Sequence, residues 1–236
     1  MQLTEALNLV PDGKGTMISF VGGGGKTSSL FALAYELAGA GKKVLVTTTT
    51  AMYNPVGACH PNITILGEYI TTEGKLKGIT KERTDEIYKL NSYDYILAEA
   101  DGSRGRPIKA PAEHEPVIPR NTGILIGVIG MDAFGKELSA AYVHRPEILS
   151  ELTGAGLWDR VNEEVIVKLV SHPLGLFKAC PLGADKILLL NKILEDGTKD
   201  AARKIGYKVL EACYSIDRVI LGAVQEEEPV KEIVLR

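Results

Sequence analysis

The feature that most restricts how this chain can fold is a run of four glycines followed by a lysine and a threonine, from Gly22 to Thr27. An apolar segment, Thr16 to Val21, precedes the glycines, and a helical pattern of apolar residues extends from about Lys26 to Ala38. A second apolar segment, KKVLVTTTT, comes next. Strand, glycine loop, helix and strand in this order form a βαβ unit, in which the strands run parallel and the crossover is right-handed.

The rest of the chain keeps alternating between apolar segments and helical patterns. We expect core strands within YDYILAEADGS, TGILIGVIGMDAFG, ADKILLLNK and DRVILGAV, the last of these being the final strand, and a hairpin insertion within NITILGEYITTEGKLKGI. Helices are expected around 80–90, 146–152 and 162–170, and in TKDAARKIGYKVLEAC with a break at Gly206. This alternation predicts a three-layer α/β sandwich with a mostly parallel central sheet, like that of phosphate-loop NTPases, and one domain over residues 1–236.

Composition excludes several classes of protein. With 27 Lys and Arg against 30 Asp and Glu in 236 residues, the net charge is −3, which does not favour a general nucleic-acid binder. No apolar run reaches about 18 residues, so we expect no membrane span, and the N-terminus lacks the pattern of a signal peptide. Three widely spaced cysteines suit a reducing compartment, and we expect a cytoplasmic protein. For Cys180, a thiol that handles sulfur or selenium and an inert, buried side chain both remain open.

The glycine run fills the second half of the phosphate-loop pattern G-x-x-x-x-G-K-[ST], whose first glycine position is taken by Phe20. Glycine tolerates the positive φ angles that turn backbone amides inward, and the following helix N-terminus favours an anion. Lys26 is expected to contact the β- and γ-phosphates, and the Thr27 hydroxyl to bind Mg²⁺. The alternative is a βα turn that binds nothing. The candidate nucleotide-binding residues of the loop are Gly22, Gly23, Gly24, Gly25, Lys26, Thr27 and Ser28.

Two carboxylates, Glu99 and Asp101, follow the apolar strand YDYILA. Because they are two residues apart in an extended segment, they share one face of the strand and can both approach the nucleotide. A carboxylate at such a strand end holds Mg²⁺ or its water in phosphate-loop enzymes. We expect Asp101 to bind the metal and Glu99 to orient a water or support the site, although ordinary surface acids would give the same pattern.

Three cations, Arg104, Arg106 and Lys109, come directly after this strand end. Next to a nucleotide site, they predict a second anionic ligand or a sensor of the γ-phosphate. A solvated loop with charges of both signs is the alternative, because Glu113 and Glu115 follow.

Two further segments are candidates for the nucleotide site. Of the threonines that end the second strand, Thr49 is the candidate for a metal ligand, although β-propensity alone explains a threonine run. Asn191 and Lys192 resemble the start of the N-K-x-D element that reads guanine in GTPases, but Leu194 occupies the aspartate position. The sequence therefore leaves open whether ATP or GTP is the nucleotide.

Five segments together resemble the YqeC-type family, the selenium-dependent hydroxylase accessory proteins. They are FVGGGGKTSSLFALA, VLVTTTTAMY, AEADGSRGRPIKAPAEHEPVIP, VHRPEI and LLLNK, of which the third is the most specific. The resemblance implies a cytoplasmic phosphate-loop protein for the maturation of selenium-dependent molybdenum hydroxylases, which prepares or delivers the molybdenum cofactor. It also implies a phosphate loop at Gly22 to Thr27 and an acidic strand end at Glu99 and Asp101.

Three functions are compatible with these residues. The first is an accessory protein that binds ATP or GTP with Mg²⁺ and hydrolyses it, with the molybdenum cofactor and a molybdenum hydroxylase as partners. The second is a small-molecule kinase or nucleotidyltransferase acting on an anionic, pterin-type substrate. The third is a chaperone without catalytic activity, in which the nucleotide only stabilises the fold.

Overall fold

A computed structural model describes residues 1–9, 15–53 and 60–236. An eight-stranded sheet forms its centre, and all neighbouring strands in it run parallel except the last pair, β12 and β13. Across the sheet the strands are β13 (Val230–Leu235), β12 (Ile216–Gly222), β11 (Asp185–Asn191), β9 (Ile124–Gly130), β1 (Thr16–Gly22), β7 (Tyr95–Glu99), β2 (Val44–Thr48) and β4 (Ile63–Leu66).

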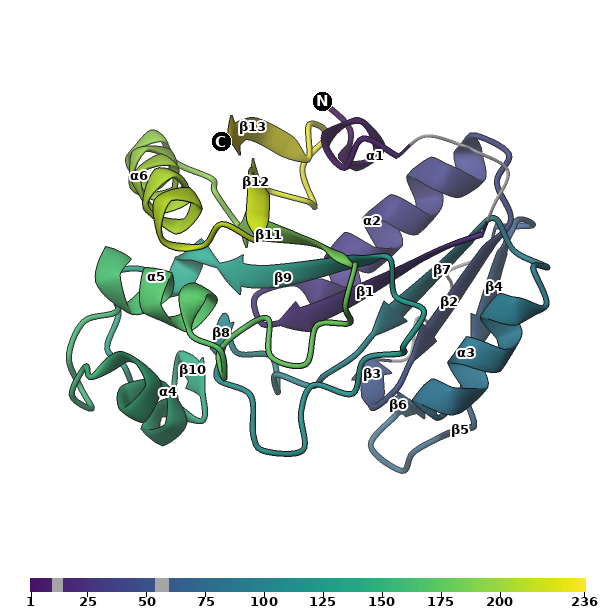
Figure 1. Cartoon of the computed structure of the whole chain (residues 1–236), viewed down its shortest axis with the longest axis horizontal. Helices are drawn as coiled ribbons and strands as arrows, with labels where there is room; N and C mark the ends of the chain where they lie inside the picture. The colour runs from purple at the N-terminus through teal and green to yellow at the C-terminus, as the bar shows by residue number, and fades with distance from the viewer. Residues whose placement is uncertain (10–14, 54–59) are drawn as a thin grey trace.

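Helices cover both faces of this sheet (Figure 1). One face carries α1 (Leu3–Ala6) and α2 (Lys26–Gly39), and the other carries α3 (Lys81–Lys89), α5 (Glu163–Ser171) and α6 (Asp196–Ala212). A further helix, α4 (Pro146–Thr153), packs on α5, and a 3-10 turn, η1 (Met131–Ala133), follows β9. The expected three-layer α/β sandwich with a mostly parallel sheet is thus confirmed. Over the described residues, no helix has both the length and the apolar character that crossing a bilayer requires.

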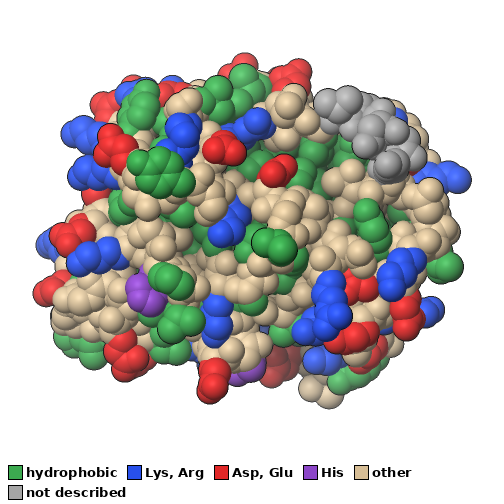
Figure 2. All heavy atoms as spheres, in the orientation of Figure 1, with side chains coloured by type: hydrophobic (Ala, Val, Ile, Leu, Met, Phe, Trp, Pro, Cys, Tyr) green, Lys and Arg blue, Asp and Glu red, His purple; other side chains and the backbone are tan. Residues whose placement is uncertain are grey.

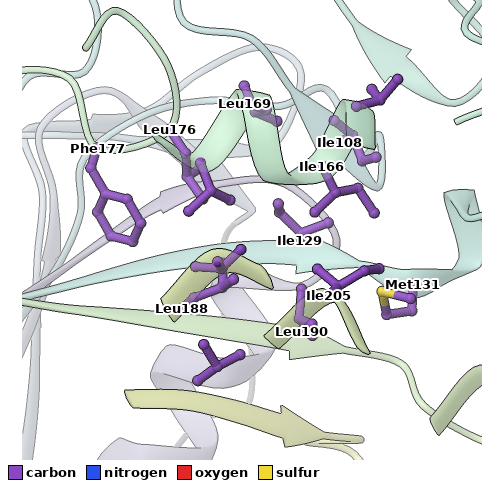
Figure 3. Packing of buried hydrophobic residues seen from close by; sticks show 14 of the residues in the cluster. Ile108, Ile129, Met131, Ile166, Leu169, Leu176, Phe177, Leu188, Leu190 and Ile205 are labelled. Atoms are coloured by element: carbon purple, nitrogen blue, oxygen red, sulfur yellow. The ribbon is translucent and has the colours of Figure 1, made fainter. Parts of the chain in front are cut away.

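The larger core lies between the sheet and helices α5 and α6 (Figure 3). Leu188 and Leu190 of β11 and Ile129 of β9 pack there with Leu169 of α5 and Ile205 of α6, and all five side chains are buried. Strands covered on both faces have no solvated side, which explains why the central strands are continuous apolar runs rather than alternating ones.

Two small sheets stand beyond the carboxyl ends of the central strands. One contains β3 (Ala51–Tyr53), β6 (Lys75–Lys77) and β5 (Tyr69–Ile70), which run antiparallel, and the other pairs β8 (Ile108–Lys109) with β10 (Val143–His144). They follow β2 and β7 in the chain, so they place additional side chains at the edge of the sheet where ligands of parallel sheets bind.

The expected hairpin insertion is confirmed but is shorter than the segment in which it was expected, and two other expectations about the elements were wrong. The segment Ile63–Leu66 pairs with β2 as an edge strand of the main sheet, so the inserted hairpin is β5 and β6 alone. β12 is followed by another strand, the antiparallel β13. Helix α6 continues through Gly206, where a Cβ atom would lie 3.3 Å from Cγ2 of Val234. The glycine therefore allows α6 to pack closely on β13, instead of ending the helix.

This packing predicts that Gly206→Leu lowers the free energy of unfolding by about 1–3 kcal/mol, because the larger side chain would push α6 away from β13. Gly197 lies in the same helix with no atom within 4 Å of its Cβ position, and Gly197→Leu is the matched control, expected to be neutral or stabilising. Urea denaturation followed by circular dichroism would measure both. Equal effects of the two substitutions would contradict this role of Gly206.

Candidate functional site

A cavity of about 450 Å³ opens at the carboxyl ends of β1, β7 and β11. Its floor is the glycine loop and the start of α2, from Gly24 to Ser28, together with Glu99 at the end of β7. The turn 102–105 and two residues of the small three-stranded sheet, Tyr53 of β3 and Lys75 of β6, form one side, and Lys192 and Gln225 form the other. The topology therefore brings segments from across the whole chain to one edge of the sheet, as in other open parallel sheets.

The first part of the glycine loop is held by the protein itself. The amides of Gly22, Gly23 and Gly24 donate to Oδ2 of Asp101 and to the carbonyl oxygens of Val128 and Arg106. At Gly24, where φ is +76°, a Cβ atom would lie 2.1 Å from the backbone nitrogen of Gly130. These glycines thus have a packing reason that is independent of any ligand. The glycine run is therefore insufficient evidence for phosphate binding, and the side chains around it must decide.

The second part of the loop presents donors toward the cavity. Gly25, at φ +120°, precedes α2, which begins at Lys26 without a side-chain cap. We find no partner for the amides of 25–28 among the residues that the structure describes. Asn191 fixes this position, because its Nδ2 donates to the carbonyl oxygen of Gly24 while its Oδ1 accepts from the amide of Val224. Unpaired amides at a helix N-terminus form an anion site.

Lys26 lies under the loop with 3% of its surface exposed. Its Nζ donates to the carbonyl oxygen of Gly22 at 2.7 Å and lies 3.2 Å from Oδ1 of Asp101 and 3.8 Å from Oε1 of Glu99. Burial alone would lower the pKa of Lys26, but the two carboxylates outweigh it, so the pKa lies above its ordinary value. The ammonium group is therefore charged.

Thr27 and Glu99 supply a pair of oxygen atoms beside Lys26. The Thr27 hydroxyl donates to Oε2 of Glu99 at 2.6 Å, and both residues line the cavity. Burial raises the pKa of Glu99 above its ordinary value, more than Lys26 and Thr27 lower it. A hydroxyl and a carboxylate are the hard oxygen ligands that Mg²⁺ prefers, and it needs only one or two of them beside phosphates and water. These two residues fit Mg²⁺.

Asp101, expected to bind the metal, is not among the residues that line the cavity. Its carboxylate is buried, accepts from the amide of Gly22, and contacts Lys26 and, at 3.1 Å, Lys109. Lys109 is 1% exposed and lies 2.8 Å from Oε2 of Glu115, which in turn contacts Arg145. Burial would raise the pKa of Glu115, but the neighbouring cations Arg145 and Lys109 lower it to about 2. Asp101 and Lys109 thus belong to a chain of alternating charges behind the loop and do not line the cavity.

Of the other candidate residues, some line the cavity and some do not. Arg104 and Lys192 line the cavity. The exposed side chain of Arg106 does not, and its carbonyl oxygen accepts from Gly24. Thr49, expected at the metal, also lies outside the cavity lining, because its hydroxyl donates to the carbonyl oxygen of Val117 at 2.6 Å.

Sequence reasoning missed Tyr53, Lys75 and Gln225, which all line the cavity. Tyr53 and Lys75 face each other across the pairing of β3 with β6, and Gln225 follows β12. The expected hairpin was the available signal for Lys75, but nothing local showed where it would fold.

A smaller hollow of about 160 Å³ adjoins the cavity and shares Lys192 and Gln225 with it. Leu194, Ala223 and Glu226 are among its other lining residues, and Leu194 is 71% exposed. Because Leu194 replaces a carboxylate, the feature that selects guanine in the N-K-x-D element is missing from this position.

Neither of the two described cysteines, Cys180 and Cys213, lines the cavity. Cys180 packs against the larger core, and burial raises the pKa of its thiol, which disfavours the reactive thiolate. Cys59 lies outside the described residues. Within 1–9, 15–53 and 60–236, we find no group of three His, Cys, Asp or Glu side chains that could hold a metal ion.

The chain of charges predicts that Asp101→Asn lowers the free energy of unfolding by about 3–5 kcal/mol, because Lys26 and Lys109 lose a buried counter-ion. Adding Lys109→Met should restore part of this loss, since one uncompensated cation is removed. Urea denaturation of the two single variants and the double variant would measure the coupling. Additive effects would show that the two side chains do not interact.

Three comparisons relate the chain to known proteins. The family model described as YqeC protein matches residues 18–147. The "Uncharacterized protein YqeC" of Escherichia coli (strain K12) is 34% identical over 232 residues, which cover 91% of this chain and 90% of that protein. The crystal structure of hydrogenase maturation factor HypB from Archaeoglobus fulgidus aligns over 95% of this chain and 87% of that chain, with a TM-score of 0.45 and 13% identity. The family match and the E. coli relative show that this chain belongs to the YqeC family.

Proposed function

We propose that the protein binds a nucleoside triphosphate with Mg²⁺ in this cavity and hydrolyses it. The observation that supports the proposal most is the contact between the Thr27 hydroxyl and Glu99, beside the buried ammonium group of Lys26 and the unpaired amides that begin α2. A glycine turn that binds nothing would not need a lysine that is buried beside two carboxylates and lines a cavity.

Each residue has a distinct role in this proposal. The amides of 25–28 bind the β-phosphate, and Lys26 exchanges its contacts with Gly22 and Asp101 for phosphate oxygens. Thr27 and Glu99 would hold Mg²⁺, which would supply positive charge beside the phosphates when bound. We assign the metal to Glu99 instead of Asp101, because Asp101 is already paired with Lys26 and Lys109 behind the loop. Asn191 keeps the loop in place, and Lys192 contacts the base, which is that of ATP or GTP.

We also propose that this activity serves the maturation of selenium-dependent molybdenum hydroxylases in the cytoplasm, by preparing or delivering the molybdenum cofactor. The support is the resemblance of the five sequence segments to the hydroxylase accessory proteins. Incubation of the protein with labelled triphosphate, the isolated pterin cofactor and an apo-hydroxylase would test it. Activation of the hydroxylase that depends on triphosphate is the expected result, and activation that is equal without triphosphate would contradict it.

A second function, as a small-molecule kinase or nucleotidyltransferase, is favoured by the part of the cavity that extends past the loop to Arg104 and Lys75. An enzyme that only hydrolyses the triphosphate has no need of cations there. Transfer of label from the triphosphate to the pterin would favour this function, whereas release of free phosphate or diphosphate alone would favour hydrolysis.

The proposal predicts that Lys26→Ala weakens triphosphate binding and slows hydrolysis. The phosphates lose the main cation that contacts them, and this loss costs several kcal/mol of transition-state stabilisation. Calorimetry with ATP, GTP and CTP, with and without Mg²⁺, would measure binding. Lys43→Ala, at an exposed position between α2 and β2 and outside the cavity lining, is the control. Hydrolysis by the Lys26 variant at the rate of the unchanged protein would rule out the proposed mechanism.

The assignment of the metal predicts that Glu99→Gln and Thr27→Val each raise the Mg²⁺ concentration needed for half-maximal hydrolysis by about tenfold or more, because an oxygen ligand is lost or weakened. Thr49→Val should leave this concentration unchanged, since the Thr49 hydroxyl contacts Val117. Titration of hydrolysis with Mg²⁺ would decide. If Thr49→Val raised this Mg²⁺ concentration and Glu99→Gln did not, the assignment to Glu99 would be contradicted. Thr49, the metal ligand expected from the sequence, would then be favoured.

A further inference from the structure

Cations outnumber carboxylates among the described residues that line the cavity. Among the described residues that line it, four are cations and one is a carboxylate: Lys26, Lys75, Arg104, Lys192 and Glu99. On the face shown in Figure 2, side chains of both signs are interspersed, in keeping with the net charge of −3. The excess in the cavity is therefore a local feature, which favours anionic ligands there.

Among the described cations that line the cavity, Arg104 has no ion pair and no side-chain hydrogen bond to any residue that the structure describes, whereas Lys192 lies 2.7 Å from Asp132. Arg104 occupies the first central position of a tight turn, in which the amide of Arg106 donates to the carbonyl oxygen of Ser103 at 3.0 Å. The two central residues, Arg104 and Gly105, have φ angles of +50° and +75°, the signs of a type I′ turn. Arginine is disfavoured in this conformation. A strained residue with an unpaired charge at the rim of a cavity indicates a binding role.

Tyr53 and Lys75 face this turn. The Nζ of Lys75 lies 5.9 Å from the centre of the Tyr53 ring, which is 62% exposed. A Cβ atom on Gly105 would lie 3.9 Å from the Tyr53 hydroxyl, so the turn and the pair of strands β3 and β6 form two walls of one recess. Lys75 also lies 3.4 Å from Glu73, but this pair is exposed and therefore weak.

This recess lies on the opposite side of the glycine loop from Lys192 and Gln225. In the sheet, β9 and β11 lie on one side of β1, and β7 and β2 lie on the other. Lys192 and Gln225 follow β11 and β12, whereas β3, which carries Tyr53, follows β2. A nucleotide with its phosphates on the loop and its base near Lys192 leaves the side of Tyr53 free.

We propose that this recess, formed by Arg104, Lys75 and Tyr53, binds a second ligand at the same time as the nucleotide: a small aromatic compound that carries a phosphate group. This proposal rests on the proposed function, because it assumes that the triphosphate occupies the glycine loop. Arg104 and Lys75 match a phosphate group, for which the planar guanidinium has the better geometry. The exposed Tyr53 ring provides a surface on which a planar ring stacks.

Phenyl phosphate is a probe for this chemistry, and inorganic phosphate and phenol test its two halves separately. We would titrate each into the protein saturated with Mg²⁺ and a non-hydrolysable triphosphate, by calorimetry and by saturation-transfer NMR. We expect phenyl phosphate to bind more tightly than inorganic phosphate, and phenol to bind least. Arg104→Gly and Lys75→Ala should each weaken phenyl phosphate binding about tenfold or more, and Tyr53→Ala should remove the advantage over inorganic phosphate.

Two controls separate binding from folding. Arg104→Gly relieves a strained backbone, so the melting temperature of this variant should be equal to or above that of the unchanged protein. Binding of phenyl phosphate should nevertheless be lost. Lys77→Ala removes a charge from the same strand as Lys75 but outside the cavity lining, and should leave probe binding unchanged.

Different failures have different meanings. Binding of phenyl phosphate that Arg104→Gly does not change would overturn the second site, as would an Arg104→Gly variant that loses affinity for the triphosphate instead, since Arg104 would then be a γ-phosphate contact. If no triphosphate binds, the proposed function fails, and the titration is repeated without nucleotide. Probe binding that is then lost in Arg104→Gly but kept in Lys26→Ala supports the recess, and the reverse result overturns it.

Discussion

The ammonium group of Lys26 is the centre on which this site depends. It holds the carbonyl oxygen of Gly22 from below the loop and neutralises Asp101 and Glu99, which would otherwise repel each other in a buried place. A buried charge is tolerated only when it is paired, and removal of one partner costs several kcal/mol. A phosphate oxygen that approaches the loop therefore competes for a cation that already stabilises the fold. The proposed nucleotide binding would therefore be coupled to the local stability of the loop.

This coupling extends beyond the loop. Asp101 shares Lys109 with Glu115, and Glu115 contacts Arg145, which directly precedes α4. The chain of alternating charges joins the end of β7 to the pair of short strands β8 and β10. Lys109 is almost fully buried because carboxylates on two sides replace its hydration. Asp101, Lys109 and Glu115 all lie in AEADGSRGRPIKAPAEHEPVIP, the segment whose resemblance to the family is the most specific. Internal ion pairs thus account for several charged residues of this segment.

The local parts of the fold and site were predictable, and the long-range parts were not. Strand, glycine loop and helix follow from residues that are adjacent in the chain, and so does the position of Glu99 at a strand end. Nothing local shows which of two carboxylates two residues apart meets Thr27 and which meets Lys109, because that depends on the packing of β8. Tyr53 and Lys75 reach the cavity only through the pairing of β3 with β6. The edge strand β4 and the antiparallel β13 likewise depend on partners far away in the sequence.

Backbone strain gives an independent view of the same site. Arg104, Arg145 and Lys192 all have positive φ angles, between +50° and +66°, which are unfavourable for residues other than glycine and asparagine. Two of these cations line the cavity and the third ends the chain of charges. Selection for stability alone would favour glycine at such positions, since it adopts this conformation without a steric penalty. Cations at these positions therefore cost stability. The cost is explained where the strained backbone places the charge for an interaction: Arg145 contacts the carboxylate of Glu115, and Arg104 is placed for the proposed ligand.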